Sequence, residues 1–175
     1  MVDIHDKKKR SAIMSAVRSK NNRSTELKIL AELRRNRIFG WRRHLSLPGH
    51  PDFAWREQKV ALFVDGCFWH GCKKCKKIPK SNVEFWVEKV RRNRVRDRRY
   101  TRALQRKGWK VIRVTECQIA NSRGLEKAIV KIVKTLRLAC IGSYAKRTAG
   151  RDYVYRVDEK VKKIQRRKKS KLKRR

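Results

Sequence analysis

Three cysteines lie within nine residues of one another in the segment 64–75, which reads Val-Asp-Gly-Cys-Phe-Trp-His-Gly-Cys-Lys-Lys-Cys. Cys67, Cys72 and Cys75 are close enough along the chain to chelate one metal ion, and Cys117 offers a fourth thiolate from a later element. Zinc in structural sites is held by four such ligands in a tetrahedron. The spacing departs from the common pair of Cys-x-x-Cys motifs, so four unrelated buried cysteines stay open as the alternative. The sequence therefore favours a fold in which structural zinc clamps a loop to a distant element.

Two aromatic residues, Phe68 and Trp69, stand between these cysteines. Because neighbouring side chains in a loop cannot easily both point into a core, we expect them to stack on a flat group. Trp86 is a third candidate for this role, although packing within its helix would also account for it. Apolar side chains of this kind can enter between base steps of a duplex and unstack them. A nucleobase is the flat group that we expect.

The charge of the chain supports this expectation. Lys and Arg number 52 against 15 Asp and Glu, a formal net charge of +37, and such a chain repels itself unless a polyanion is bound. Nucleic acid is the natural partner. A membrane surface is the competing polyanion, yet no run approaches the roughly 18 apolar residues of a spanning helix. The N-terminus lacks the apolar segment of a secretory signal, which predicts a cytoplasmic, nucleoid-associated protein. In that reducing compartment we expect the remaining cysteine, Cys140, to be a buried free thiol.

The 175 residues suffice for one ordinary domain with an appendage. Apolar spacing, capping residues and β-forming runs predict helices at 7–20, 24–36, 82–107 and 125–138, and strands at 41–45, 51–55, 60–64 and 109–114. The first helix would either pack on the core or lie along DNA as part of an N-terminal arm of residues 1–20. This order indicates an α/β domain, a small mixed sheet flanked by helices, spanning residues 1–140.

Residues 141–175 form a basic tail in this interpretation. From residue 160 onward, eleven of sixteen residues are Lys or Arg and none is acidic. Such a composition cannot bury enough apolar surface to fold alone. We expect a disordered arm that adds salt-dependent affinity for phosphates.

Acidic residues stand at the ends of two predicted strands. Asp52 begins one strand, and Asp65 follows Phe63 and Val64 at the end of the next. Since side chains alternate along a strand, Phe63 and Asp65 share a face and Asp65 could approach Asp52. Paired carboxylates suit Mg²⁺, with Glu26 as a water-bridged neighbour. Ordinary turn chemistry would also explain both aspartates.

A histidine in the cysteine loop favours catalysis over turn chemistry. His70 lies five residues after Asp65, where a neutral imidazole could take the proton of an attacking water. Asp97, on the predicted long helix, could accept the other ring N–H and orient the imidazole. Together these residues indicate a hydrolytic site.

Several blocks in one order carry a resemblance to a known family. They are Ser-Leu-Pro-Gly-His-Pro-Asp-Phe at 46–53, Asp-Gly-Cys-Phe-Trp-His-Gly-Cys at 65–72, Glu-Phe-Trp at 84–86, Asn93, Arg-Asp-Arg-Arg at 96–99, Gly-Trp-Lys-Val at 108–111 and Glu-Cys at 116–117. Over about residues 6–140 the chain resembles the very-short-patch repair (Vsr-type) DNA mismatch endonucleases. The resemblance implies a restriction-endonuclease-like fold. It also implies nicking of one strand 5′ to the thymine of a T:G mispair left by deamination of 5-methylcytosine.

The resemblance also implies residue roles. It puts Mg²⁺ on Asp52 and on the backbone carbonyl of Val64, with His70 as general base, Asp97 as its support and Glu26 nearby through water. It assigns structural zinc to the four cysteines named above and intercalation to Phe68, Trp69 and Trp86. The chain departs from the family pattern twice. Asp65 replaces a histidine of the best-studied type and could bind metal directly. The third zinc position, Cys75, is shifted by one residue relative to some members.

Two other functions stay open at this point. One is a general nicking or restriction nuclease on the same fold, which would cut paired duplex as readily as mispaired duplex. The other is a zinc-stabilised nucleic-acid-binding protein without catalysis. In the favoured interpretation the partner is double-stranded DNA with a T:G mismatch, the protein acts as a monomer, and other repair proteins are further candidate partners.

Overall fold

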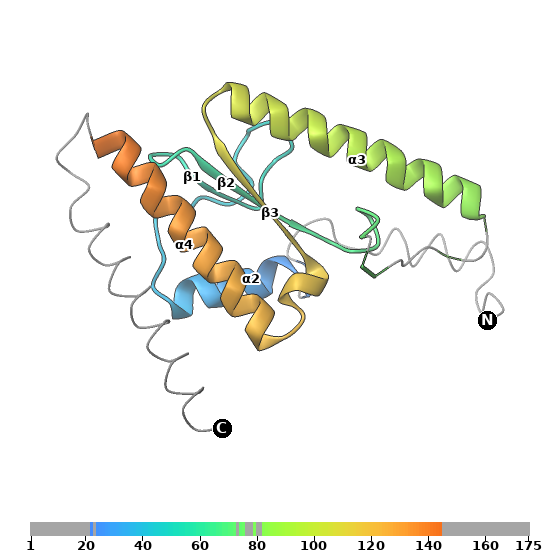
Figure 1. Cartoon of the computed structure of the whole chain (residues 1–175), viewed down its shortest axis with the longest axis horizontal. Helices are drawn as coiled ribbons and strands as arrows, with labels where there is room; N and C mark the ends of the chain where they lie inside the picture. The colour runs from blue at the N-terminus through green and yellow to red at the C-terminus, as the bar shows by residue number, and fades with distance from the viewer. Residues whose placement is uncertain (1–21, 23, 73, 76–78, 80–81, 145–175) are drawn as a thin grey trace.

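The computed structural model describes residues 22, 24–72, 74–75, 79 and 82–144 (Figure 1). The predicted helix at 7–20 and all of the basic tail beyond residue 144 lie outside these residues. The described elements are, in chain order, α2 (Glu26–Arg35), β1 (Phe53–Trp55), β2 (Val60–Asp65), α3 (Val83–Arg106), β3 (Lys110–Thr115), the 3₁₀ turn η1 (Glu116–Ile119) and α4 (Ser122–Tyr144).

The three strands form one mixed sheet in the order β1-β2-β3. β1 runs antiparallel to β2, with Phe53 opposite Leu62, and β3 runs parallel to β2, with Leu62 opposite Ile112. A parallel pair needs a long crossover, and α3 supplies it between β2 and β3. The prediction of a small mixed sheet is confirmed.

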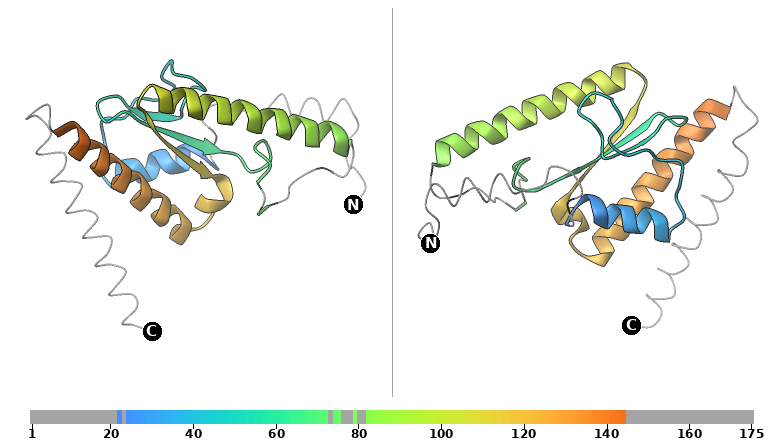
Figure 2. Two further views of the ribbon diagram at one scale, coloured as in Figure 1. Left: turned by 45° about the horizontal axis from the view of Figure 1, so that its top comes forward. Right: turned by 180° about the vertical axis from the view of Figure 1, so that it is seen from behind.

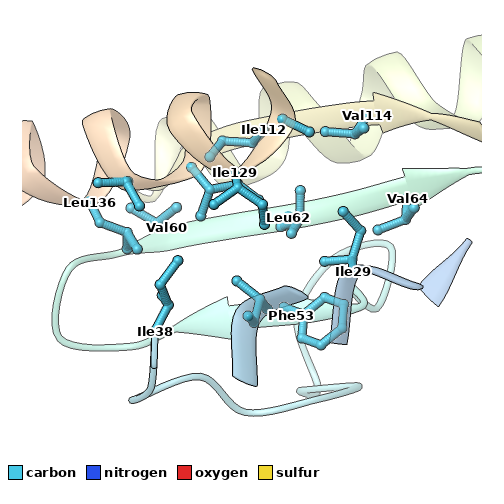
Figure 3. Close-up of a cluster of buried hydrophobic side chains, with 14 of the residues drawn as sticks. Ile29, Ile38, Phe53, Val60, Leu62, Val64, Ile112, Val114, Ile129 and Leu136 are labelled. Carbon is cyan, nitrogen blue, oxygen red and sulfur yellow. The ribbon is translucent and has the colours of Figure 1, made fainter. Parts of the chain in front are cut away.

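Helices cover both faces of this sheet, as predicted, with α3 on one side and α2 and α4 on the other (Figures 1 and 2). The alternation along β2 decides which residues meet which helix. Val60, Leu62 and Val64 face the main core with α2 and α4, whereas Ala61 and Phe63 meet Leu104 of α3. Figure 3 shows the main core, in which Ile29, Ile129 and Leu136 pack toward the middle strand. Phe63 and Asp65 therefore share a face, as expected.

Two predicted elements were wrong in detail. The strand at 41–45 is reduced to a single bridge between Arg42 and Ala54, because His44 adopts a left-handed backbone with φ 50°, which ends extended pairing. The last helix is longer than predicted and covers Ser122–Tyr144. Cys140 is buried on this helix, as expected, and burial raises the pKa of its thiol. Among the described helices, none combines the length and apolar character needed to cross a bilayer.

Candidate active site

A cleft of about 920 Å³ opens beside the end of β2, between the start of α2 and the middle of α3. It collects residues from five separate parts of the chain. The predicted site residues that line it are Glu26, Asp52, Val64, Asp65, Phe68, Trp69, His70 and Asp97. Trp86 and the four cysteines of the predicted zinc site do not line it.

Asp52 is tied to the backbone of the neighbouring strand. Its Oδ2 accepts a hydrogen bond from the Val64 N–H at 2.7 Å. Burial raises the pKa of Asp52 to about 6, and the nearby charges of Glu26 and Asp65 add to this effect, while the Val64 hydrogen bond opposes it. A half-buried carboxylate with two acidic neighbours favours a cation beside it.

Glu26 occupies the first turn of α2 and is only 2% exposed. It forms an ion pair with Arg43, and its Oε1 lies 3.0 Å from Nε2 of His44. Ligand atoms of Glu26, His44 and Asp52 all lie within 4.8 Å of one another. The sequence pattern indicated neither Arg43 nor His44 as a site residue. Neither could be distinguished from the other basic residues of the chain, since only the irregular turn at His44 directs this segment to Glu26.

His70 is held by the acid that the sequence indicated. Its Nδ1 lies 2.6 Å from Oδ2 of Asp97, which belongs to α3. Although burial opposes it, the hydrogen bond with His70, together with the charges of His70, Arg113 and Arg96, lowers the pKa of Asp97. A carboxylate at Nδ1 fixes the proton on that nitrogen and leaves Nε2 as the basic atom.

Asp65 has a partner, Arg113, that the sequence pattern did not indicate. Its two carboxylate oxygens accept hydrogen bonds from Nε and Nη2 of Arg113, at 2.7 and 2.8 Å. Asp65 thus forms a two-point ion pair across β2 and β3. Its expected role as a direct metal ligand beside Asp52 stays a prediction. Arg113 is the single arginine of the predicted strand at 109–114, and its place in that strand gives no pairing information by itself.

The loop after β2 lies against α3 through several contacts. Asn93 donates to the Trp69 carbonyl at 2.8 Å, and Arg94 donates to the carbonyls of His70 and Gly71. Gly71 has φ 57°, and a Cβ there would lie 2.2 Å from a methyl carbon of Val90. Only glycine therefore allows this close approach of the loop to the helix.

The three candidate intercalating residues form one aromatic cluster. Ring centroids of Phe68 lie 4.9 Å from Trp69 and 5.0 Å from Trp86, with edge-to-face geometry. Phe85 joins them at 5.2 Å from Trp86 and is 52% exposed, and Nζ of Lys89 lies 5.4 Å from the Trp69 centroid. Trp86 is 7% exposed, so it supports the cluster while Phe68 and Trp69 line the cleft.

The four cysteines of the predicted zinc site converge. Their sulfurs all lie within 4.8 Å of one another, with 3.5 Å between Cys72 and Cys117 and 3.5 Å between Cys67 and Cys75. Four thiolates about 2.3 Å from zinc are separated by about 3.8 Å in a tetrahedron, so this set fits the ion. Cys75 belongs to the cluster despite its shifted position.

The thiols of this cluster lie in different surroundings. The N–H of Cys75 is the main cause that lowers the pKa of Cys72 to about 7, which favours the thiolate that metals bind. Burial raises the pKa of Cys67 instead, although the N–H of Cys117 donates to its sulfur at 3.2 Å. A bound cation would overcome that cost by neutralising the thiolates.

Comparisons with known proteins identify a family and several relatives of this chain. Residues 2–77 match the family model described as DNA mismatch endonuclease Vsr. The chain is 36% identical over 136 residues to the type II nicking enzyme V.XorIIP of Xanthomonas oryzae pv. oryzae, covering 76% of this chain and 98% of that protein. It is 41% identical over 130 residues to the DNA mismatch endonuclease Vsr of Escherichia coli, covering 73% of this chain and 80% of that protein.

A third relative extends the comparison. The type II nicking enzyme V.NmeAIP of Neisseria meningitidis is 34% identical over 143 residues, which cover 78% of this chain and 98% of that protein. The relatives thus include proteins named for mismatch cleavage and proteins named for nicking.

Proposed function

The chain belongs to the Vsr family of DNA mismatch endonucleases and is a DNA endonuclease, and from this premise we propose that it nicks one strand 5′ to the mispaired thymine of a T:G mismatch in a Mg²⁺-dependent reaction. One observation supports the proposal most: the His70–Asp97 pair, at 2.6 Å, lines the same cleft as Asp52. A general base and a candidate cation ligand therefore border one space large enough for a phosphodiester.

In this proposal His70 acts on water. With Nδ1 bonded to Asp97, Nε2 is free to take a proton from a water that attacks the scissile phosphate. Asp97 then stabilises the imidazolium that forms, as a buried carboxylate does beside a catalytic histidine. The P–O bond opposite the attacking water breaks, and the leaving oxygen of the strand end takes a proton from solvent water.

The residues present fit a magnesium ion. Asp52 and the backbone carbonyl of Val64 would hold it, and Glu26 would contact it through water. When bound, Mg²⁺ neutralises charge that develops on the phosphate. The pKa of Asp52 is raised chiefly by burial and further by the charges of Glu26 and Asp65, and a nearby cation would offset all three effects, which supports this assignment. His44 lies in the same group, although imidazole is a poorer ligand for Mg²⁺ than oxygen.

The aromatic cluster supports recognition of a mispaired site. Insertion of rings between base steps costs a few kcal/mol per step, and less where pairing is already defective. Phe68 and Trp69 follow directly after Cys67, so zinc on the four cysteines would fix the base of the loop that carries them. A rigid mount of this kind would keep the energy of insertion from being lost in loop movement.

A general nicking activity remains the second candidate, because several relatives are named nicking enzymes. The third interpretation, a binding protein without catalysis, disagrees with membership in an endonuclease family. Incubation with Mg²⁺ and end-labelled duplexes that carry either T:G or the matched pair tests the remaining two. We expect one nick beside the mispaired thymine, lost in Asp52→Ala and His70→Ala; equal cutting of the matched duplex would support the general nuclease.

A further inference from the structure

Arg113 connects the two acids that flank His70. It belongs to β3, pairs in register with Phe63, and lies with its guanidinium 4.7 Å from the Phe63 ring. From there Nε and Nη2 reach both oxygens of Asp65, and Nη2 also lies 3.3 Å from Oδ2 of Asp97. The side chain is 24% exposed, so these contacts form largely out of water.

The same two acids lie on opposite sides of the histidine ring, one hydrogen-bonded to Nδ1 and the other near Nε2. Asp97 bonds Nδ1 at 2.6 Å, and Oδ1 of Asp65 lies 3.8 Å from Nε2. Asp97 Oδ2 therefore faces both His70 and Arg113. If the guanidinium were removed, two carboxylates would lie near one imidazole with no fixed cation between them, and the ring could rotate toward either.

The ion pair also limits what Asp65 can do. A two-point bond between guanidinium and carboxylate is among the strongest charge-assisted hydrogen bonds in proteins, and here it involves both oxygens of Asp65. A metal ligand must present an oxygen lone pair to the ion, in competition with this bond. Asp52, in contrast, accepts the Val64 N–H through one of its two oxygens, Oδ2.

We infer that Arg113 is a positioning residue that fixes Asp65 and Asp97 around His70, and that Asp65 serves as its anchor and not as a ligand of the catalytic metal. The inference rests on the proposed role of His70 as general base. Displacement of a reacting group by about 1 Å can cost on the order of 100-fold in rate. Loss of Arg113 should therefore slow the chemical step and leave DNA affinity nearly unchanged.

The test uses the full chain with its zinc, and three variants: Arg113→Met, Arg113→Lys and Asp65→Asn. Single-turnover nicking of a T:G duplex gives the rate, binding to the same duplex without Mg²⁺ gives the affinity, and proton NMR of ¹⁵N-histidine-labelled protein reports the low-field resonance of His70 Nδ1–H. Arg34→Met is the matched control, because Arg34 is an exposed arginine at the far end of α2 from the cleft.

We expect Arg113→Met to nick on the order of 100-fold more slowly at unchanged affinity and to lose the low-field resonance. Arg113→Lys should recover part of the nicking rate and part of the resonance, since lysine keeps the positive charge but cannot make the two-point hydrogen bond to Asp65. Asp65→Asn should keep the Mg²⁺ concentration for half-maximal rate. A low-field resonance retained in folded Arg113→Met would overturn the inference. So would a Mg²⁺ requirement raised about tenfold or more in Asp65→Asn, the loss expected for a metal-site residue.

These readouts separate the inference from the proposed function. If His70→Ala nicks as fast as the wild type, the proposed base is wrong, whatever Arg113 does. If His70→Ala is inactive and Arg113→Met behaves like Arg34→Met, the positioning role alone is wrong. If Arg113→Met does not fold, the low-field resonance of Arg113→Lys and the Mg²⁺ requirement of Asp65→Asn still test the inference.

Discussion

Substitution Asp52→Asn should stabilise the fold and abolish nicking. The pKa of Asp52 rises from 3.8 to about 6 on folding, chiefly through burial. Each pKa unit corresponds to about 1.4 kcal/mol, so the ionised side chain opposes folding by at most about 3 kcal/mol. Because water screens a partly exposed group, about 1–3 kcal/mol is the expected range. Asparagine keeps an oxygen for the Val64 N–H and carries no charge.

The sign of the pH dependence follows from linkage. A carboxyl whose pKa is raised in the folded state binds its proton more tightly there, so the wild type loses stability as pH rises from about 4 through 6. The amide that replaces the carboxyl in Asp52→Asn does not titrate. The stability difference between Asp52→Asn and wild type should therefore be small near pH 4 and reach its full value above about pH 7.

Urea unfolding at pH 5 and pH 8, in buffer with zinc retained and no added Mg²⁺, measures this difference. Glu57→Gln is the matched control, because Glu57 is exposed in the turn between β1 and β2, whereas Asp52 precedes the other end of β1. Mg²⁺ should then stabilise the wild type and leave Asp52→Asn unchanged, as expected for a ligand that binds only the folded state. If Asp52→Asn is less stable than wild type at pH 8, the carboxylate is already compensated by its neighbours and the reasoning is refuted.

Three further predictions concern the cysteine cluster, the aromatic cluster and the group of Glu26, His44 and Asp52. Cys117→Ser should lose bound zinc, measured by elemental analysis, and should unfold at lower temperature, whereas Cys140→Ser should keep its zinc. Trp69→Ala should lower the preference for T:G over matched duplex about tenfold or more, since base stacking on an aromatic ring contributes about 1–3 kcal/mol; an unchanged ratio of nicking rates would contradict this. His44→Ala should raise the Mg²⁺ concentration for half-maximal nicking, because His44 lies beside Glu26 and Asp52 in the candidate metal site. A loss of duplex affinity with an unchanged Mg²⁺ requirement would instead indicate a DNA contact.

Much of the fold could be predicted because the pattern was local. The strand at 60–64 is a continuous apolar run, as is usual for a strand buried on both faces, and the structure buries all of Val60–Asp65. The two long helices carried clear apolar stripes. The prediction of a strand at 41–45 was wrong because His44 has a left-handed backbone conformation. That conformation accompanies a tertiary contact with Glu26, which no local pattern contains.

Part of the site could also be predicted. The grouping of the four thiols and the pairing of His70 with Asp97 followed from residue types whose chemistry allows few other arrangements. The partner of Asp65 could not be found in this way. The chain has 52 basic residues, and only the parallel register of β2 and β3 selects Arg113 among them.

The sequence by itself determined which chemistry was available: thiols for zinc, acids and a histidine for hydrolysis, aromatic rings for bases and a large positive charge for phosphates. Tertiary structure decided which of these groups meet, because strand register and helix crossover set distances between residues far apart in the chain. The ion pair of Asp65 with Arg113 and the approach of Glu26, Arg43 and His44 are of this second kind. Side-chain type fixes the chemistry that a group can perform, and only the packed backbone fixes which partner it meets.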